Sequence, residues 1–429
     1  MAPAQKQWTL QDCLDYARQH NLTLQQARLK QQQAEEDVKS ASAQMLPSVS
    51  ANTNHSLGYR PWPENGTMTV TNGQVETKVE KSYYNGSYGI NASWTLWDGN
   101  KRQNALKQNR LTAQQSELSY SETSNSIQEQ IAQLYVQILY LTEARKVSEQ
   151  TLETSKKNEE RGKQMLEVGK MSKADVAQLT AQRASDEYTI VEAQSNIDRY
   201  TLQLRQLLKL RADDDFQLAM TQPDDQQALG QIEDLESVYS QALQSRPEIA
   251  SSQIAIQSSE LSIKTARAGY MPTLGLSGGI GTSTNSLSDK DWGKQMKNNF
   301  DASVGLTLSV PLFDQRQTKT SIRKAKLQRE EALIELQAKE DELYKTIEGY
   351  WLDAKTNQQK FKAAIETEKS EQTSYDLLSE QFRLGLKNIV ELMTGKDRLS
   401  TAQQNRLQSK YQAVLAMQML DFYKGENIK

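Results

Sequence analysis

An internal duplication constrains this 429-residue sequence more than any other feature. Pro47 and Pro272 lie 225 positions apart and follow similar residues, whereas Asp98 and Asp314 lie 216 positions apart, each after an apolar pair. Both halves show the same order of short helices, proline, strand, loop, strand, aspartate and two long helices. The period is far too long for a solenoid, so we expect two similar halves packed with pseudo-symmetry in one protomer.

Heptad-spaced apolar residues predict long coiled-coil helices in both halves. The residues with this spacing are Ile127, Ile131, Leu134, Ile138 and Leu141, then Ile190, Ile197 and Leu204, then Leu336, Leu343, Ile347, Ala354 and Phe361, and finally Ala413, Met417 and Leu420. From Gly99 to Val168 the sequence has no proline and only one internal glycine. At 1.5 Å per residue, this segment predicts a rod of roughly 100 Å.

Each predicted rod ends at a glycine, Gly169 or Gly385, and these two positions are again 216 apart. Glycine adopts the left-handed backbone that ends a helix, so we expect a tight reversal at both positions. A polar residue then starts the return helix, with an acidic residue three positions later, at Ser172 and at Asn388. This pattern predicts a capped helix start after each reversal.

Strict alternation of apolar and polar residues predicts β-strands at 87–97 and 300–312. Two weaker strands are predicted after Pro47 and after Pro272. The segments 58–86, 284–299 and 213–230 contain turn residues and mixed charge, so we expect two exposed loops and a surface linker. Gln315 occupies the place of Gly99 in the second half, so we expect that glycine is not required at the corner between strand and helix.

The strand lengths match the roughly 9–11 residues that a tilted strand needs to cross a bilayer. A soluble sheet remains an alternative. However, the apolar seams of the helices are expected to pack against one another, which leaves few apolar residues to cover the sheet. Five aromatic residues are candidates for membrane-interface girdles, namely Tyr83, Tyr84, Tyr88, Trp94 and Trp97. Four strands cannot close into a barrel, and open edges are forbidden in lipid, so several copies must share one barrel.

Composition and charge exclude several functions. Hydrophobic residues make up 37% of the chain, below the roughly 45–50% of globular proteins. A net charge of -3 without long basic runs gives no reason to expect a nucleic-acid partner. No apolar run reaches the length of about 18 residues that predicts a membrane-spanning helix.

The one match to an enzyme motif does not occur in the structural context that the motif requires. Ser277 lies in a G-x-S-x-G match, but this match falls inside a predicted strand, and the chain's two histidines, His20 and His55, both lie upstream. These histidines and the single Cys13 make no metal cluster. No nucleotide-binding loop occurs, so we expect neither an enzyme nor a cofactor or metal site.

The sequence resembles the TolC-type outer-membrane efflux channels of Gram-negative bacteria. The resemblance rests on the residues before and after the strands and on the two tips, at 45–47, 97–99, 167–169, 271–272, 310–314 and 382–385. It implies a homotrimer with a twelve-stranded β-barrel in the outer-membrane lipid and a twelve-helix α-barrel that extends through the periplasm. It also implies that a periplasmic adaptor protein and an inner-membrane pump are partners.

The resemblance further implies which residues act. It places adaptor docking at the two tips, in Val168, Gly169, Lys170, Leu384, Gly385 and Leu386. It places a periplasmic gate just past the second tip, in Phe382, Lys387 and Glu391, with Asp175 as the first-half counterpart of Glu391. Phe382 lacks the phenol oxygen of the family's tyrosine, and Thr394 stands in place of its second aspartate.

On this interpretation the chain divides into eight segments. They are N-terminal helices (1–46), two strands with a long extracellular loop (47–97), a helical hairpin (98–209), an equatorial linker (210–234), further helices (235–270), two strands (271–313), a second hairpin (314–423) and a tail (424–429). The predicted function is that of a passive exit channel in a tripartite efflux or secretion system. The alternative is a soluble coiled-coil scaffold with a small β-domain.

Overall fold

A computed structural model describes residues 7–62, 66–70, 73–77, 80–211 and 214–428. The chain forms two compact units, and each unit takes segments from both halves of the sequence. One unit consists of residues 1–31, 115–253 and 334–429, and the other of residues 32–114 and 254–333. The repeats are therefore intertwined and are not separate domains.

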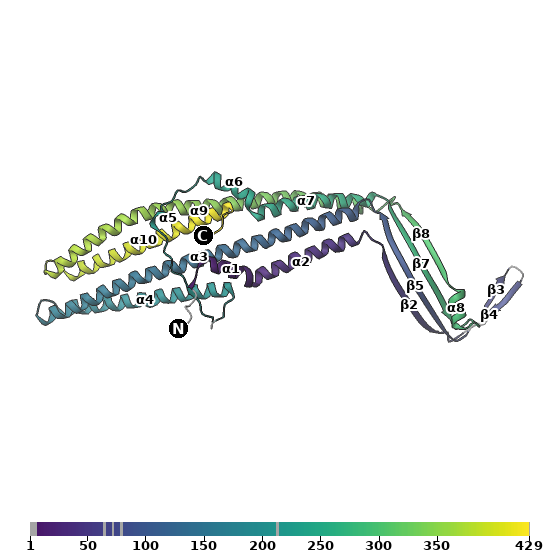
Figure 1. The fold of residues 1–429 in the computed structure, drawn as a ribbon, viewed down its shortest axis with the longest axis horizontal. Coiled ribbons are helices and arrows are strands. Elements are labelled where there is room, and N and C mark those ends of the chain that lie inside the picture. Colours follow the sequence, from purple (N-terminus) through teal and green to yellow (C-terminus); the bar gives the residue numbers. More distant parts are fainter. Residues whose placement is uncertain (1–6, 63–65, 71–72, 78–79, 212–213, 429) are drawn as a thin grey trace. The chain divides into compact units, whose positions relative to one another are not determined.

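The second unit contains a four-stranded antiparallel sheet in the order β2-β5-β7-β8 (Figure 1). The strands are β2 (Ser48–Tyr59), β5 (Ser82–Trp97), β7 (Thr273–Asn285) and β8 (Asp301–Ser309). All four predicted strands are confirmed, and the central β5–β7 pair joins the two halves of the chain. Strands β2 and β8 are the two edges of this sheet.

One face of the sheet is apolar, and much of it is left uncovered by the described residues. Alternate residues of β8 from Val304 to Leu308 are exposed, and so are Leu57 on β2 and Trp94 on β5. The period-two pattern thus places apolar side chains on a common face, as expected for a strand.

The two predicted loops contain regular structure, so these predictions were partly wrong. In the first, β2 runs on to Tyr59 and β5 starts at Ser82, and between them β3 (Gly66–Val70) pairs with β4 (Gly73–Thr77). Threonine and valine favour strands, and this preference outweighs the loop-like composition. In the second, α8 (Trp292–Asn298) forms after Asp291, whose carboxylate accepts a hydrogen bond from the Lys294 N–H.

Four long helices repeat the duplication in their lengths. Helices α3 (Lys101–Glu167) and α9 (Gln317–Arg383) have 67 residues each, and α4 (Lys173–Leu208) and α10 (Ile389–Lys424) have 36 each. The heptad residues Ile131, Ile138, Ile347 and Phe361 are fully buried, so the predicted seams form helix contacts.

Shorter elements complete the fold. They are β1 (Gln7–Trp8), α1 (Leu10–His20), α2 (Leu22–Ala43), β6 (Gln217–Leu218), α5 (Asp225–Ala228), α6 (Leu235–Ser245), α7 (Pro247–Arg267) and η1 (Ala268–Tyr270). The predicted surface linker at 213–230 was partly wrong, because β6 pairs with β1 and Ala228 is buried against Phe361 and Ala413. Among the described residues, no helix combines the length and apolar character that a membrane crossing requires.

Candidate functional site

Both long hairpins turn on a left-handed glycine. Gly169 has a φ of 72° and Gly385 a φ of 77°. The N–H of Lys170 donates to the Met165 carbonyl at 2.8 Å, and that of Leu386 donates to the Gln381 carbonyl at 2.9 Å. This is the hydrogen bond of a Schellman ending, so the predicted reversals are confirmed.

The tips expose apolar side chains. Val168, Leu384 and Leu386 are exposed, and a Cβ atom added to either tip glycine would meet nothing within 4 Å. Lys170 adds an exposed cation to the first tip. Exposed apolar side chains that lie together in this way are typical of a protein-interaction site.

Lys387 and Glu391 form an ion pair at the start of α10. Lys387 Nζ lies 2.6 Å from Glu391 Oε1, and both side chains are partly exposed. Glu391 Oε2 also accepts the Asn388 N–H at 3.2 Å, while Asn388 Oδ1 accepts the Glu391 N–H at 3.0 Å. The hydrogen bond from Lys387, followed by that from Asn388, lowers the pKa of Glu391 below its ordinary value.

Asp175 occupies the equivalent position at the start of α4. Its carboxylate accepts the Ser172 N–H at 3.2 Å, and Ser172 Oγ accepts the Asp175 N–H at 3.1 Å. Both predicted capping boxes are therefore present. In the part of the chain that the structure describes, Asp175 makes no hydrogen bond or ion pair with Lys387 or Glu391.

Phe382 is buried in a small apolar cluster. Its ring is packed with Leu179 of α4 and with Ile389 and Leu392 of α10, and Met165 of α3 lies at the edge of this cluster. Phe382 therefore holds the two hairpins together close to their tips.

A buried lysine in this region escaped the sequence analysis. Lys396 on α10 is only 4% exposed, and its Nζ lies 2.6 Å from Asp186 Oδ2 of α4 and 2.9 Å from Ser155 Oγ of α3. Ser155 also donates a hydrogen bond to Asp186. The positions of Ile389, Leu392, Lys396 and Leu399 follow steps of three and four, so the apolar stripe itself could have revealed the buried lysine.

The five predicted girdle aromatics lie in β5, toward its two ends. Near the first end, Tyr83 lies under the Arg60 guanidinium, the Tyr84 hydroxyl is 2.6 Å from His55 Nδ1, and Tyr88 meets His55 edge to face. Near the other end, Trp94 Nε1 donates to the Met45 carbonyl at 2.8 Å, and Trp97 is exposed.

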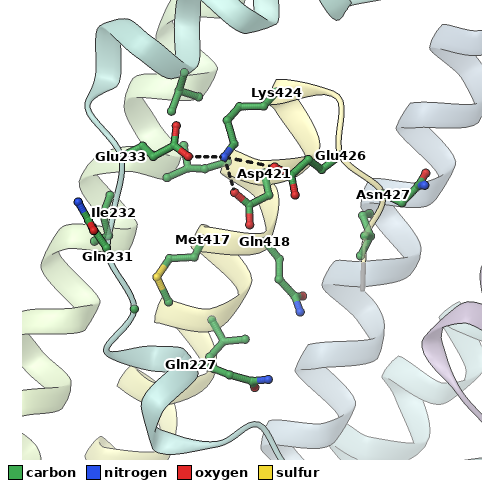
Figure 2. Close-up of a pocket in the computed structure, with 15 residues that line it drawn as sticks. Gln227, Gln231, Ile232, Glu233, Met417, Gln418, Asp421, Lys424, Glu426 and Asn427 are labelled. Carbon is green, nitrogen blue, oxygen red and sulfur yellow. Dashed lines mark hydrogen bonds and ion pairs between the residues drawn. The ribbon is translucent and has the colours of Figure 1, made fainter.

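Figure 2 shows a cavity of about 310 Å³ near the C-terminal end of α10. Lys424 lies beside three carboxylates, with Nζ–O distances of 2.8 Å to Glu233, 2.9 Å to Asp421 and 3.6 Å to Glu426. Burial works to lower the pKa of Lys424, but its hydrogen bonds to Glu233 and Asp421 raise it above the ordinary value. The cavity includes none of the predicted site residues, and its cation is satisfied by this chain's own carboxylates.

The chemical motifs do not form a reactive centre. Ser277 lies within β7, where its hydroxyl donates to the Gly305 carbonyl at 3.4 Å, and not at a strand-to-helix turn. Over the described residues, no three histidine, cysteine or acidic side chains gather in a way that suits a metal ion.

Known proteins share this architecture over nearly the whole chain. BepC, an outer membrane efflux protein of Brucella suis, is 22% identical over 410 residues, which cover 95% of this chain and 83% of BepC. The structure of VceC from Vibrio cholerae superposes with a TM-score of 0.80 at 16% identity, covering 98% of this chain and 97% of VceC. The CusC structure gives a TM-score of 0.83 at 17% identity, covering 97% and 92%.

A second relative matches part of the chain. AprF, the alkaline protease secretion protein of Pseudomonas aeruginosa, is 27% identical over 184 residues, which cover 43% of this chain and 37% of AprF. The family model described as outer membrane efflux protein matches residues 13–208 and 238–426, which is most of the sequence. These matches support the channel and not the soluble scaffold. The chain therefore belongs to the outer membrane efflux protein family, whose members are channels at the Gram-negative outer membrane with a periplasmic extension.

Proposed function

We propose that three copies of this outer-membrane efflux channel assemble into one passive exit duct. The sheet carries this proposal, because among the described residues its edge strands β2 and β8 are each paired on one side only, and its apolar face is exposed. Open edges are not tolerated in lipid, so β8 of one copy must pair with β2 of the next. Three copies then close a barrel of twelve strands.

The segments take matching roles in this assembly. Residues 47–97 and 271–313 form the membrane barrel, with aromatic girdles at Tyr83, Tyr84 and Tyr88 and at Trp94 and Trp97. Residues 98–209 and 314–423 form the periplasmic tunnel of twelve long helices. Residues 1–46, 210–234, 235–270 and 424–429 surround that tunnel.

We assign adaptor docking to the two tips. Their exposed apolar side chains, Val168, Leu384 and Leu386, stand beside Lys170 and the open space around Gly169 and Gly385. An adaptor held there connects the duct to an inner-membrane pump, which must supply the energy for transport. The names of the relatives span efflux and protease secretion, so the proposal covers the exit path and not one cargo.

Lys387, Glu391 and Asp175 line the gate in this proposal, and Phe382 fixes the distance between the hairpins behind it. The partly exposed carboxylate of Glu391 then attracts cations to the entrance. We expect Glu391→Gln to lower the cation-to-anion permeability ratio measured from reversal potentials. Glu380→Gln is the matched control, because Glu380 is an exposed acid that pairs with Arg383 before the tip. Equal ratios in the two variants would remove Glu391 from the gate.

The oligomeric state tests the assembly itself. Light scattering of the detergent-solubilised protein, corrected for bound detergent, is expected to give three times the 48.6 kDa of one chain. A monomer that keeps its fold would contradict the shared barrel, because its sheet edges and apolar face would stay open.

A further inference from the structure

The duplication relates a contact inside one chain to a contact between neighbouring copies. Helix α2 enters the edge strand β2, and α9 follows the edge strand β8 (Figure 1). Their counterparts in the other halves, α7 and α3, adjoin the central strands β7 and β5. The observed contact between α3 and α7 is therefore a template for α9 of one copy against α2 of the next, which rests on the assembly proposed above.

The strands allow a check on using the contact within one chain as a template for the contact between copies. The paired residues Ser93 and Ser277 map, by the offsets of 216 and 225, to Ser309 and Asn52, which are both polar. The paired Tyr88 and Thr282 map to Val304 and Leu57, which are 82% and 87% exposed in the single chain. The mapped register thus keeps residues of the same sheet face together, as one closed sheet requires. On the apolar face it also sets Leu306 beside His55 and Leu308 beside Thr53.

The same transfer gives a charge pair between the helices. In the chain, Gln108 Nε2 of α3 donates to Ser262 Oγ of α7 at 3.0 Å. Gln108 maps to Lys324 and Ser262 maps to Asp37. A neutral hydrogen bond inside the protomer is therefore replaced by opposite charges at the equivalent position between protomers.

The exposure of the mapped residues in the single chain supports a contact that a neighbouring copy would complete. Gln108 and Ser262 are partly buried, whereas Lys324 and Asp37 are exposed and form no ion pair with any described residue. Leu111 is partly buried, but its counterpart Leu327 is exposed.

The charges around this pair are complementary as well. Glu35 and Glu36 precede Asp37 on α2, and Arg323 and Lys326 flank Lys324 on α9. Neighbouring residues of a helix point about 100° apart, so Asp37 and Lys324 face each other in the mapped contact, while Glu35, Arg323 and Lys326 add to the charge around it. Glu36 already pairs with Lys39 of the same helix at 2.7 Å. No acidic residue occurs between Asp314 and Glu330, so every charged residue in this part of α9 is a cation.

We propose that the acidic segment 35–37 of one copy binds the basic segment 323–326 of the next, as an electrostatic seam below the barrel. The seam selects a second copy of this chain, because opposite charges attract at the mapped register and a slipped register loses the match. The central pair of the seam is Asp37 with Lys324.

Charge reversal tests the seam. We expect Lys324→Asp and Asp37→Lys each to raise the trimer dissociation constant on the order of 10-fold or more, since each reversal acts at three equivalent seams. The double variant Asp37→Lys with Lys324→Asp restores the attraction and should recover most of the wild-type constant. High salt should weaken the effect of each single reversal, because these charges are exposed.

Lys264→Asp is the matched control, because Lys264 is an exposed lysine on α7, which is not a seam helix. Trimer dissociation is measured by light scattering or native mass spectrometry on the full chain in detergent. A wild-type trimer that is insensitive to both single reversals, or a double variant that recovers nothing, would overturn the seam and leave the trimer intact. A wild-type monomer would overturn the seam together with the assembly.

Discussion

Gly99 shows how a single residue sets the corner between sheet and helix. Both corners use two successive left-handed residues, Gly99 and Asn100 in the first half and Gln315 and Arg316 in the second. The sequence comparison suggested that glycine is dispensable at this corner. The structure corrects this expectation for the first half, because a Cβ at position 99 would lie 2.6 Å from the Met271 Cβ.

We expect Gly99→Ala to destabilise the protein more than Gly169→Ala. Both substitutions place alanine at a positive φ, which costs about 1–2 kcal/mol, but only position 99 adds a clash with a packed side chain. Thermal unfolding of the two detergent-solubilised variants measures the difference. Equal melting temperatures would show that the Met271 side chain can move away from the new Cβ without a loss of stability.

Acid is expected to loosen the start of α10. Since Lys387 and then the Asn388 N–H lower the pKa of Glu391, the ionised carboxylate stabilises the tip above the unfolded-state pKa of glutamate. This contribution is lost as the pH falls through the lowered folded-state pKa. Hydrogen exchange of residues 388–394, corrected for intrinsic rates, should rise with acid in the wild type.

Glu391→Gln serves as the reference for this measurement. Its neutral amide does not titrate, so its exchange should lack the acid-dependent rise. The same acid response in both proteins would assign the effect to another group.

At the scale of elements, the periodicity of apolar residues predicted the long helices and the main strands, which occur in both halves. It missed the short elements that depend on local signals. The strands and the long helices follow from the spacing of apolar residues, because one face or stripe must be apolar. The reversals follow from the left-handed backbone that glycine adopts at a helix end. The hairpin β3–β4 and helix α8 depend on a short turn and a single cap, whose signals are weak against a polar background. The burial of Lys396 was not predicted, because a charged residue is not counted among the apolar residues that define the stripe.

The ion pair of Lys396 and Asp186 connects α10 with the first hairpin. Removing Asp186 leaves the buried ammonium of Lys396 with only the more distant Asp397 carboxylate, at 3.5 Å, so we expect Asp186→Ala to cost about 3 kcal/mol of unfolding free energy. Adding Lys396→Met should recover part of this loss, because methionine fills a similar volume without a charge. Urea unfolding of the two single variants and the double variant measures the coupling.

The stability of the double variant relative to Asp186→Ala shows whether the isolated lysine is penalised. If the double variant is no more stable than Asp186→Ala, the lysine is not penalised by isolation, and the network is only a packing contact.

For the whole molecule, the sequence supplied the class of the protein but not its arrangement in two units. The duplication suggested two halves side by side, whereas each compact unit combines segments of both halves. Linear spacing cannot reveal this, since it depends on how long helices pass from one unit to the other. The open edges of the sheet are the feature that no single chain satisfies.

Planar bilayer recording tests the central claim of a shared, passive duct most directly. Purified protein added to a bilayer without any pump or adaptor should produce discrete conductance steps, because the proposed trimeric barrel and tunnel would enclose a continuous water path. Folded protein that inserts into the bilayer and never conducts, even after Glu391→Gln and Lys387→Gln remove the ion pair at the proposed gate, would contradict the account.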